Sequence, residues 1–146
     1  MRTMGLDVGT RTVGIAVSDA LGITAQGLTT LRRTNLKSDL AEMKRLVAEH
    51  EVTRLVVGLP LNMDGSEGPR AQASRAFGEA AARETGLPLE YQDERLTTVA
   101  AERVLLEADV SRRKRREVID RLAAQLILQS WLDARRPTQD EEPEVP

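Results

Sequence analysis

The sequence predicts an α/β fold on a mixed β-sheet, in which the first three strands are antiparallel and helices join the later ones. Three short apolar segments, 2–7, 12–18 and 23–31, follow one another with turns too short for a parallel crossover. Beyond them, residues at helical spacing alternate with short apolar runs, a pattern typical of right-handed crossovers between parallel strands. The chain has 146 residues, which suits a single domain.

The strands of the first part are bounded by turn residues. The first strand, 2–7, ends just before Gly9, and the second, 12–18, ends at Asp19. A turn at 20–22 then leads to the third strand. We therefore expect these three strands to form an antiparallel meander.

The second part alternates helices with strands. Leu36, Leu40, Met43 and Val47 recur at helical spacing and predict a helix that runs to about His50. In chain order, the remaining expected elements are a buried strand at 55–59, a helix from Pro69 to about Thr85, a strand at 89–92, a helix from about Thr97 to Ala108 and a last helix from about Glu117 to Ala134.

The composition excludes several classes of protein. The chain has no cysteine, so it forms no disulfide or thiolate metal site, and its one histidine, His50, argues against a Ser-His-Asp hydrolase. Aromatic residues make up 2% of the chain, too few for a base-stacking platform. The sequence also shows no membrane span or signal peptide. We expect a cytoplasmic protein, without a membrane partner, whose chemistry rests on carboxylates, hydroxyls and arginines.

Charge is distributed unevenly along the chain. The net charge is −2, but residues 137–146 hold four acidic side chains and no basic one, so the remainder carries about +2. Because this tail has three prolines and no apolar periodicity, we expect it to be disordered, which leaves residues 1–136 as the domain. Five consecutive cations stand before the last helix: Arg112, Arg113, Lys114, Arg115 and Arg116. Such a run is equally a solvated loop or a contact for a polyanion.

Three acidic residues have positions that suggest chemistry. Asp7 ends the first strand, Glu94 directly follows the fifth, and Asp120 lies at the edge of the apolar stripe of the last helix. Asp7 and Glu94 can instead cap the turn or helix that comes next. Asp120 can form a buried salt bridge with Arg121 or Arg116. The functional interpretation is a hard-cation site, because carboxylates without histidine or cysteine favour Mg²⁺ or Mn²⁺.

Four motifs cover nearly the whole chain. They are MGLDVGTRTVGIAVSD at 4–19, VGLPLNMDGSEGPR at 57–70, DERLTT at 93–98 and IDRLAAQLILQ at 119–129. In content and order they resemble the motifs of the YqgF/RuvX family, bacterial proteins assigned as nucleases with a ribonuclease H-like fold. The chain departs from that family at Thr12, a place that is often basic, and in its acidic tail. Neither departure affects the three acidic residues.

The resemblance implies a five-stranded ribonuclease H-like sheet and makes Asp7, Glu94 and Asp120 the catalytic and metal-ligating triad. The family is assigned either to trimming of the 5′ end of the precursor of 16S ribosomal RNA or to resolution of Holliday junctions. The sequence agrees with both, and we favour the ribosomal precursor on the resemblance alone. Junction cleavage would favour a homodimer, because two symmetry-related strands must be cut.

Phosphodiester hydrolysis requires an activated water, charge neutralisation at phosphorus and a stabilised leaving oxygen. Two Mg²⁺ or Mn²⁺ ions about 4 Å apart supply all three, and Asp7 could bridge them while Glu94 and Asp120 complete the ligand shells. His50 is expected at the far end of a surface helix, so activation of water by a metal ion is favoured over activation by histidine.

Several residues are candidates for binding substrate phosphates. Arg11, Arg95 and the run 112–116 offer guanidinium or ammonium groups. Asn62 and Ser66 offer donors in a glycine-containing loop near a helix N-terminus, although a plain structural turn explains them equally well.

Two other function classes fit parts of the sequence. The Asp-Val-Gly-Thr turn at 7–10 is similar to the first phosphate loop of the ATPases related to actin, heat-shock protein 70 and sugar kinases, but those clamp nucleotide between two domains and this chain has length for one. A non-catalytic nucleic-acid-binding module is the other alternative. It is disfavoured because clustered carboxylates do not help a surface to bind phosphate.

Overall fold

The computed structural model of the protein describes residues 1–97 and 112–135, with the side chains of the last helix described from residue 118 onward. Its strands are β1 (Arg2–Val8), β2 (Thr12–Ser18), β3 (Ala25–Arg32), β4 (Val52–Leu59) and β5 (Leu89–Asp93). Its helices are α1 (Leu36–Glu49), α2 (Pro69–Thr85), the single 3₁₀ turn η1 (Glu94–Leu96) and α4 (Arg112–Arg135).

The strands form one mixed sheet with the order β3-β2-β1-β4-β5. β1 is the central strand, antiparallel to β2 and parallel to β4, and the outer pairs β2–β3 and β4–β5 continue these two directions. The predicted mixed sheet with an antiparallel N-terminal meander is therefore confirmed.

Local sequence explains where the two helices of the first half begin and end. The side chain of Asn35 caps α1 by accepting a hydrogen bond from the backbone N–H of Ser38 at 2.9 Å. Proline at position 69 occupies the first turn of α2, where its missing N–H has no helical partner to lose. Gly86 ends α2 in the left-handed conformation, at a φ of 71°.

The last helix begins earlier than the sequence predicts. It starts at Arg112, five residues before the expected start at Glu117, so the cationic run 112–116 lies on its first turns and its interpretation as a loop is wrong. The helix expected over 97–108 falls, from residue 98 onward, outside the described residues, and so does the acidic tail 137–146.

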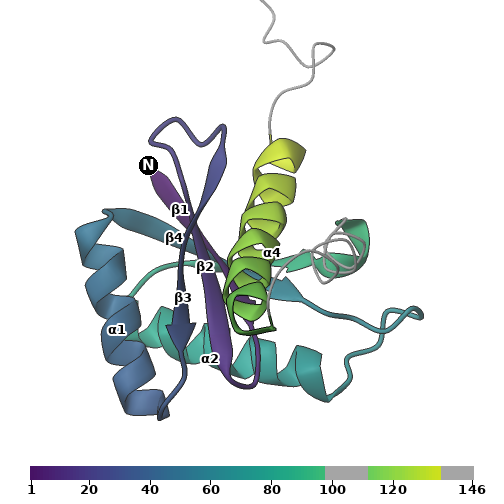
Figure 1. Cartoon of the computed structure of the whole chain (residues 1–146). Coiled ribbons are helices and arrows are strands. Elements are labelled where there is room, and N and C mark those ends of the chain that lie inside the picture. The colour runs from purple at the N-terminus through teal and green to yellow at the C-terminus, as the bar shows by residue number, and fades with distance from the viewer. Residues whose placement is uncertain (98–111, 136–146) are drawn as a thin grey trace, which may run out of the picture.

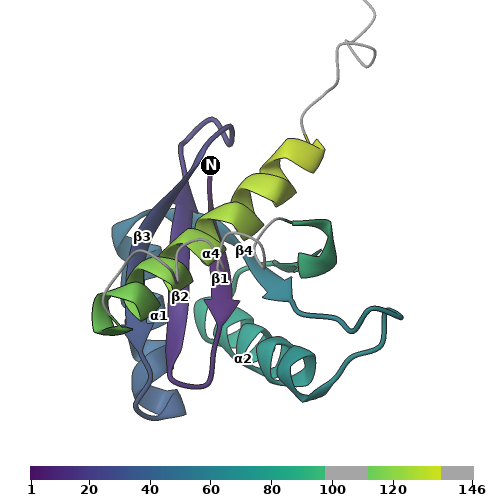
Figure 2. The same ribbon diagram turned by 45° about the vertical axis from the view of Figure 1, so that its right-hand side comes forward.

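The sheet separates two layers. α1 and α2 cover one face, and α4 lies across β3, β2 and β1 on the other and reaches β4 (Figures 1 and 2). Met4, Leu6 and Val8 of β1 point toward α1 and α2, in the larger hydrophobic cluster. Because side chains alternate along a strand, Gly5 and Asp7 face α4. None of the described helices combines the length and the apolar character that a membrane span requires.

The face under α4 is lined by small residues, which lets the helix lie against the backbone of the sheet. A Cβ atom at Gly5 would stand 2.7 Å from Cβ of Leu128. A Cβ atom at Gly14 would overlap the carbonyl oxygen of Asp120 and stand 3.2 Å from its Cα. The position of Asp120 over the sheet therefore depends on the absence of a side chain at Gly14.

Replacing Gly14 with alanine should destabilise the fold by more than about 2 kcal/mol, because the helix must move away from the sheet to admit the methyl group. The measurement is the free energy of unfolding in urea. Gly68→Ala is the matched control, since the nearest atom to its Cβ position is an ordinary 3.5 Å away and the expected cost is below about 1 kcal/mol. Equal costs for the two variants would contradict the packing argument.

Candidate active site at the carboxyl end of the central strand

Asp7 occupies the next-to-last position of β1. It pairs across β2 with Gly14, and only 6% of its surface is exposed. The turn after β1 is closed by a main-chain hydrogen bond of 2.8 Å from the N–H of Gly9 to the carbonyl of Thr12. A carboxylate this deeply buried is costly unless its charge is compensated, so its position in the sheet is typical of a functional residue.

Asp120 lies on α4 directly above Gly14, the residue that pairs with Asp7. Its carboxylate accepts, at Oδ2, a hydrogen bond from the hydroxyl group of Thr12. The side-chain stem of Arg121, one of the two salt-bridge partners considered from the sequence, instead lies against β3. Among the described side chains, Thr12 is thus the hydrogen-bond partner of the Asp120 carboxylate, and the side chain of Arg116, the other predicted partner, lies outside the described residues.

Glu94 approaches Asp7 from the opposite side, at the start of η1 and directly after β5. In the parallel ladder Leu6 pairs with Val57, so the next residue, Gly58, lies beside Asp7. Oε1 of Glu94 is 3.1 Å from the position that a Cβ atom of Gly58 would take. The three acidic residues thus reach one end of β1 from three elements, β1, η1 and α4.

In its chemistry, this donor set suits a hard divalent cation. Carboxylate and hydroxyl oxygens are the ligands that Mg²⁺ and Mn²⁺ prefer. The glycines beside Asp7 leave the space through which Asp120 and Glu94 approach it. Within residues 1–97 and 112–135, no three acidic or histidine side chains already stand together as ligands of one ion. The Asp120 carboxylate instead accepts its hydrogen bond from the hydroxyl group of Thr12.

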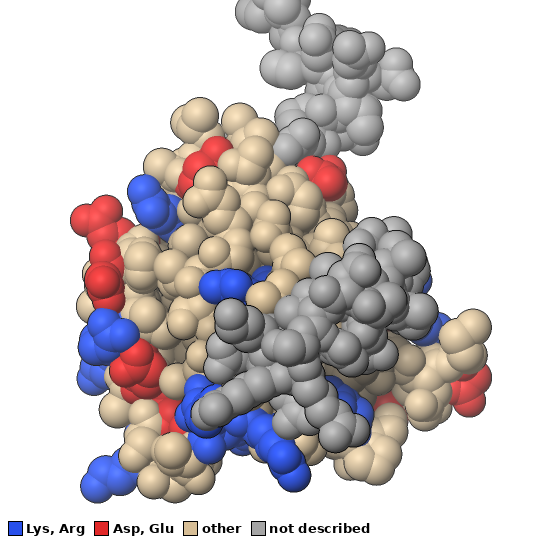
Figure 3. Space-filling model, viewed as in Figure 1, with Lys and Arg blue, Asp and Glu red and all other residues tan. Residues whose placement is uncertain are grey.

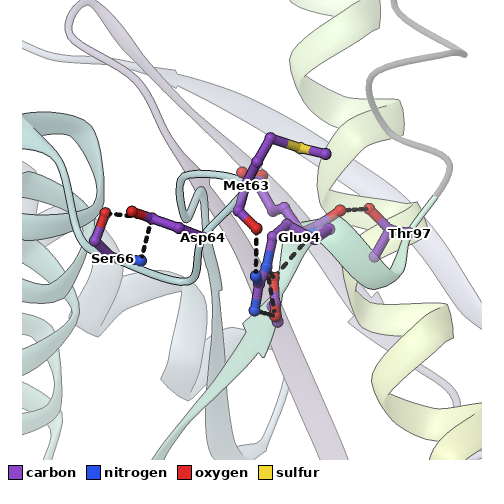
Figure 4. Close-up of polar contacts among 7 residues, drawn as sticks. Met63, Asp64, Ser66, Glu94 and Thr97 are labelled. Atoms are coloured by element: carbon purple, nitrogen blue, oxygen red, sulfur yellow. Dashed lines mark hydrogen bonds and ion pairs between the residues drawn. The ribbon is translucent and has the colours of Figure 1, made fainter.

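Arg95 ties the segment after β5 to the loop after β4 (Figure 4). Its guanidinium donates to the carboxylate of Asp93, with Nη2 2.7 Å from Oδ2, and to the carbonyl of Met63 at 3.3 Å. These hydrogen bonds from Arg95 hold the pKa of Asp93 below its usual value. Arg95, expected to contact phosphate, therefore has its charge compensated by a neighbouring carboxylate.

Asn62 and Ser66 bind each other inside the loop between β4 and α2, which projects from the sheet in both ribbon views. Nδ2 of Asn62 donates to Oγ of Ser66 at 3.0 Å, and that hydroxyl donates to Oδ1 of Asp64 at 2.6 Å. The hydrogen bond from the Ser66 hydroxyl is the main reason that the pKa of Asp64 is lowered. These contacts, of which Figure 4 draws the one between Ser66 and Asp64, match the structural-turn alternative that the sequence left open.

The other predicted site residues lie at the same end of the sheet or outside the described residues. Arg11 is exposed in the turn between β1 and β2. The backbone of the run 112–116 forms the first turns of α4, just before Asp120, and its side chains are outside the described part of the chain. His50 lies at the C-terminal end of α1, as expected, and α1 packs on the face of the sheet opposite to α4.

Sequence reasoning does not identify Thr12 or Arg70 as residues of this region. Thr12 meets Asp120 across 108 positions of sequence, and no local pattern announces that partner. Nη2 of Arg70 lies 3.5 Å from the carbonyl of Val8, directly after Asp7. The one sequence signal that could have pointed to Arg70 is its position at the end of the second motif, two residues after Gly68.

Comparison with known proteins adds family information to this geometry. The sequence model of a family described as "RuvX: Holliday junction resolvase" matches residues 1–134. A protein of Myxococcus xanthus named "Putative pre-16S rRNA nuclease" is 68% identical over 137 residues, which are 94% of this chain and 91% of that protein. A protein of Moorella thermoacetica with the same name is 65% identical over 133 residues, 91% of this chain and 95% of that one.

Two solved structures share the fold at low sequence identity. RuvC of Thermus thermophilus, in complex with a Holliday junction substrate, has a TM-score of 0.58 and 13% identity, with 92% of this chain and 96% of that chain covered. The fowlpox virus Holliday junction resolvase has a TM-score of 0.52 and 11% identity, with coverages of 92% and 99%. At these identities the similarity establishes the fold, which confirms the ribonuclease H-like sheet.

Replacing Thr12 with valine should lower the free energy of unfolding by about 1–3 kcal/mol, because it removes the donor to a partly buried carboxylate while keeping the shape of the side chain. Thr12→Ser keeps the hydroxyl and should lose less than half as much. The measurement is urea unfolding of the three proteins at neutral pH. A serine variant as unstable as the valine variant would mean that the methyl group, and not the hydrogen bond, matters at this position.

Proposed function

Because this chain belongs to the RuvX family, we propose that it is a divalent-cation-dependent nuclease that processes the 5′ end of the 16S ribosomal RNA precursor. The observation that carries the proposal is the approach of Asp7, Glu94 and Asp120 to the carboxyl end of the central strand from three separate elements. Such an arrangement of carboxylates suits the hydrolysis of a phosphodiester bond. The names of the highly identical relatives support the choice of ribosomal precursor.

A four-way DNA junction is the alternative substrate. It is favoured by the family's description and by the likeness to a resolvase that was solved with its junction. Cleavage of a junction at two symmetric positions needs two active sites, and therefore a dimer of this chain. Trimming of one RNA end needs a single active site, which one copy of this chain can provide.

The chain's own residues would divide the work of hydrolysis. Asp7 is held by the central strand and is nearly inaccessible, so it is the most rigid of the three ligands we assign. Asp120 is held from α4 and oriented by Thr12, and Glu94 reaches over Gly58 from η1. Mg²⁺ or Mn²⁺ bound there, as a pair of ions in our assignment, would supply activation of water, neutralisation of phosphate charge and stabilisation of the leaving oxygen.

Substrate recognition would use the nucleic-acid backbone more than the bases. The chain has only three aromatic residues, and Phe77 and Trp131 are buried. The arginines at this end of the sheet supply phosphate donors that do not depend on base sequence. The run 112–116 precedes Asp120 by four to eight residues of helix, about 6–12 Å at 1.5 Å per residue. This spacing supports our assignment of the run to phosphates near the reacting bond.

Replacing Asp7 with asparagine should abolish cleavage and leave the fold intact, because the amide keeps the shape of the side chain and removes its negative charge. We expect a loss greater than the roughly 10- to 100-fold caused by removing an outer-shell partner of a metal site. The measurement is cleavage of a 16S precursor fragment and of a four-way DNA junction with Mg²⁺ or Mn²⁺, with circular dichroism as the test of folding.

Each outcome of that assay has a definite meaning. Cleavage of the precursor alone by the wild-type protein supports the proposal, and cleavage of the junction alone supports the alternative. Binding of nucleic acid without cleavage by highly purified wild-type protein would favour the non-catalytic module. Activity of Asp7→Asn at the wild-type level would remove the carboxylate site from consideration.

Changing all five residues of the run 112–116 to glutamine should weaken nucleic-acid binding at low salt. Each lost phosphate contact should reduce the slope of log K against log salt concentration by roughly 0.7–0.9. The measurement is a salt titration of binding, accompanied by a titration of Mn²⁺ affinity, which should stay unchanged. An unaltered salt slope would show that the run does not contact phosphates.

A further inference from the structure

Two arginines bind the backbone immediately after Asp7. Nη1 of Arg33 donates a hydrogen bond of 2.8 Å to the carbonyl of Gly9. Nη2 of Arg70 donates to the carbonyl of Val8 at 3.5 Å. The end of β1 therefore has a guanidinium from the segment after β3 and another from the first turn of α2.

The guanidinium of Arg33 is occupied by contacts within the protein. Besides its bond to Gly9, its Nε lies 3.7 Å from Oδ2 of Asp39, a carboxylate that is 3% exposed. Its guanidinium also lies 5.1 Å from the centroid of the Phe77 ring. Because its charge is paired and its side chain is only 26% exposed, Arg33 is a structural residue that secures the turn after β1.

Arg70 differs from Arg33 in each of these respects. It is exposed, and within the described part of the chain its guanidinium makes only the long contact to Val8. The acidic residue nearest to it in the same segment, Glu67, is held by Arg75 through two hydrogen bonds of 2.9 and 3.0 Å. Among the described residues, no carboxylate compensates the charge of Arg70, and Val8 is the one group to which its guanidinium donates. This guanidinium thus lies beside the residue that follows Asp7, with further N–H donors available for a ligand.

Arg11 supplies a second cation of the same kind. It lies in the turn between β1 and β2, is exposed, and has no side-chain partner among the described residues. The carbonyl of Arg11 accepts a hydrogen bond of 2.8 Å from the N–H of Arg33, which fixes the backbone of the turn. Figure 3 shows Lys and Arg gathered along the lower part of the molecule, at the end of the sheet where this turn lies in Figure 1.

We propose that Arg70 and Arg11 form a phosphate-binding subsite at the carboxyl end of β1, which holds the backbone of the substrate strand next to the bond that is cleaved. This inference rests on the proposed nuclease function and adds to it a contact on the α2 side of Asp7. Guanidinium groups suit the ligand, because their forked N–H donors match two oxygens of one phosphate.

The subsite also defines a path for the strand. α2 and α4 lie on opposite faces of the sheet, and both begin at the end where β1 finishes (Figures 1 and 2). The contact between Arg70 and Val8 shows that α2 begins near the carboxyl end of β1. The position of Asp120 over Gly14 shows that the first turns of α4 lie near the same end. A strand held by Arg70 on one side and by the start of α4 on the other passes over Asp7.

The test compares Arg70→Gln with Arg83→Gln in the full-length protein. Both arginines belong to α2, and they are 13 residues apart, about 20 Å along the helix. The two variants therefore have the same net charge and differ in distance from Asp7. Binding is measured in EDTA by fluorescence anisotropy of a labelled RNA hairpin with a single-stranded 5′ extension, between about 50 and 200 mM salt.

We expect Arg70→Gln to weaken binding on the order of tenfold at about 50 mM salt and to reduce the salt slope by roughly 0.7–0.9. Arg83→Gln should change neither quantity measurably. Arg70→Lys should restore the salt slope but only part of the affinity, because it keeps the charge and loses the fork. Adding Arg11→Gln to Arg70→Gln should lower the slope by a second step of similar size.

The outcomes separate this inference from the proposed function. If the wild-type protein binds and cleaves RNA but Arg70→Gln binds as tightly as Arg83→Gln, the subsite is refuted and the nuclease function stands. If the wild-type protein neither binds nor cleaves the RNA or a four-way junction, the proposed function itself fails. The melting temperature of Arg70→Gln, which loses only one long hydrogen bond, should match that of the wild type.

Discussion

The structure depends on the close packing of α4 against a face of the sheet that presents little more than backbone. Glycine at positions 5, 14, 27 and 58 removes the side chains that would hold the helix away. On the helix side, Ala123 and Ala124 are buried in the same interface. Because the helix packs directly on the sheet backbone, Asp120 lies against Gly14, the residue that pairs with Asp7. No layer of side chains separates the two at this point. Packing at van der Waals distance thus sets the geometry of the carboxylates, and the opposite face, with its large aliphatic cluster, supplies most of the hydrophobic stabilisation.

The arginines around the site fall into two groups according to whether a carboxylate compensates them. Arg33, Arg75 and Arg95 are each paired with an acidic residue, and each connects two segments of the fold. Arg11 and Arg70 lie at the same end of the sheet without such a pair among the described residues. The distinction matters because a paired guanidinium must give up its partner before it binds phosphate, whereas an unpaired one loses only water. A sequence does not reveal this difference, since all five are simply arginines.

Periodicity and connection length are the properties from which the sequence predicts the fold well. Short turns require the antiparallel meander of β1, β2 and β3, and intervening helices require the parallel pairs, so these two features determine the mixed character of the sheet. The start of α4 is harder to predict, because five cations oppose the helix dipole at its N-terminus and make Glu117 the more favourable starting point. The bond between Thr12 and Asp120 is beyond sequence reasoning, because it joins residues 108 positions apart and exists only once the sheet and helix have packed. The acidic residues can be chosen from the sequence, but the glycines that bring them together can be recognised only in three dimensions.

The proposed substrate and its metal ions would compensate two concentrations of like charge at this end of the sheet. Asp7 is a buried carboxylate, and Glu94 and Asp120 lie on elements that reach the same end of β1, an arrangement that the divalent cations of the proposed function would stabilise. The cations of 112–116 stand at the positive end of a helix dipole, where anions are favoured. Phosphate groups of a nucleic acid have the charge that this helix end lacks. A bound nucleic acid would therefore act on both groups of charges. Its phosphates would bring negative charge to the start of α4 and to Arg70, and they would share the metal ions with the carboxylates. In the proposed function, these two contributions would add to the affinity of the protein for a nucleic acid with its bound metal ions.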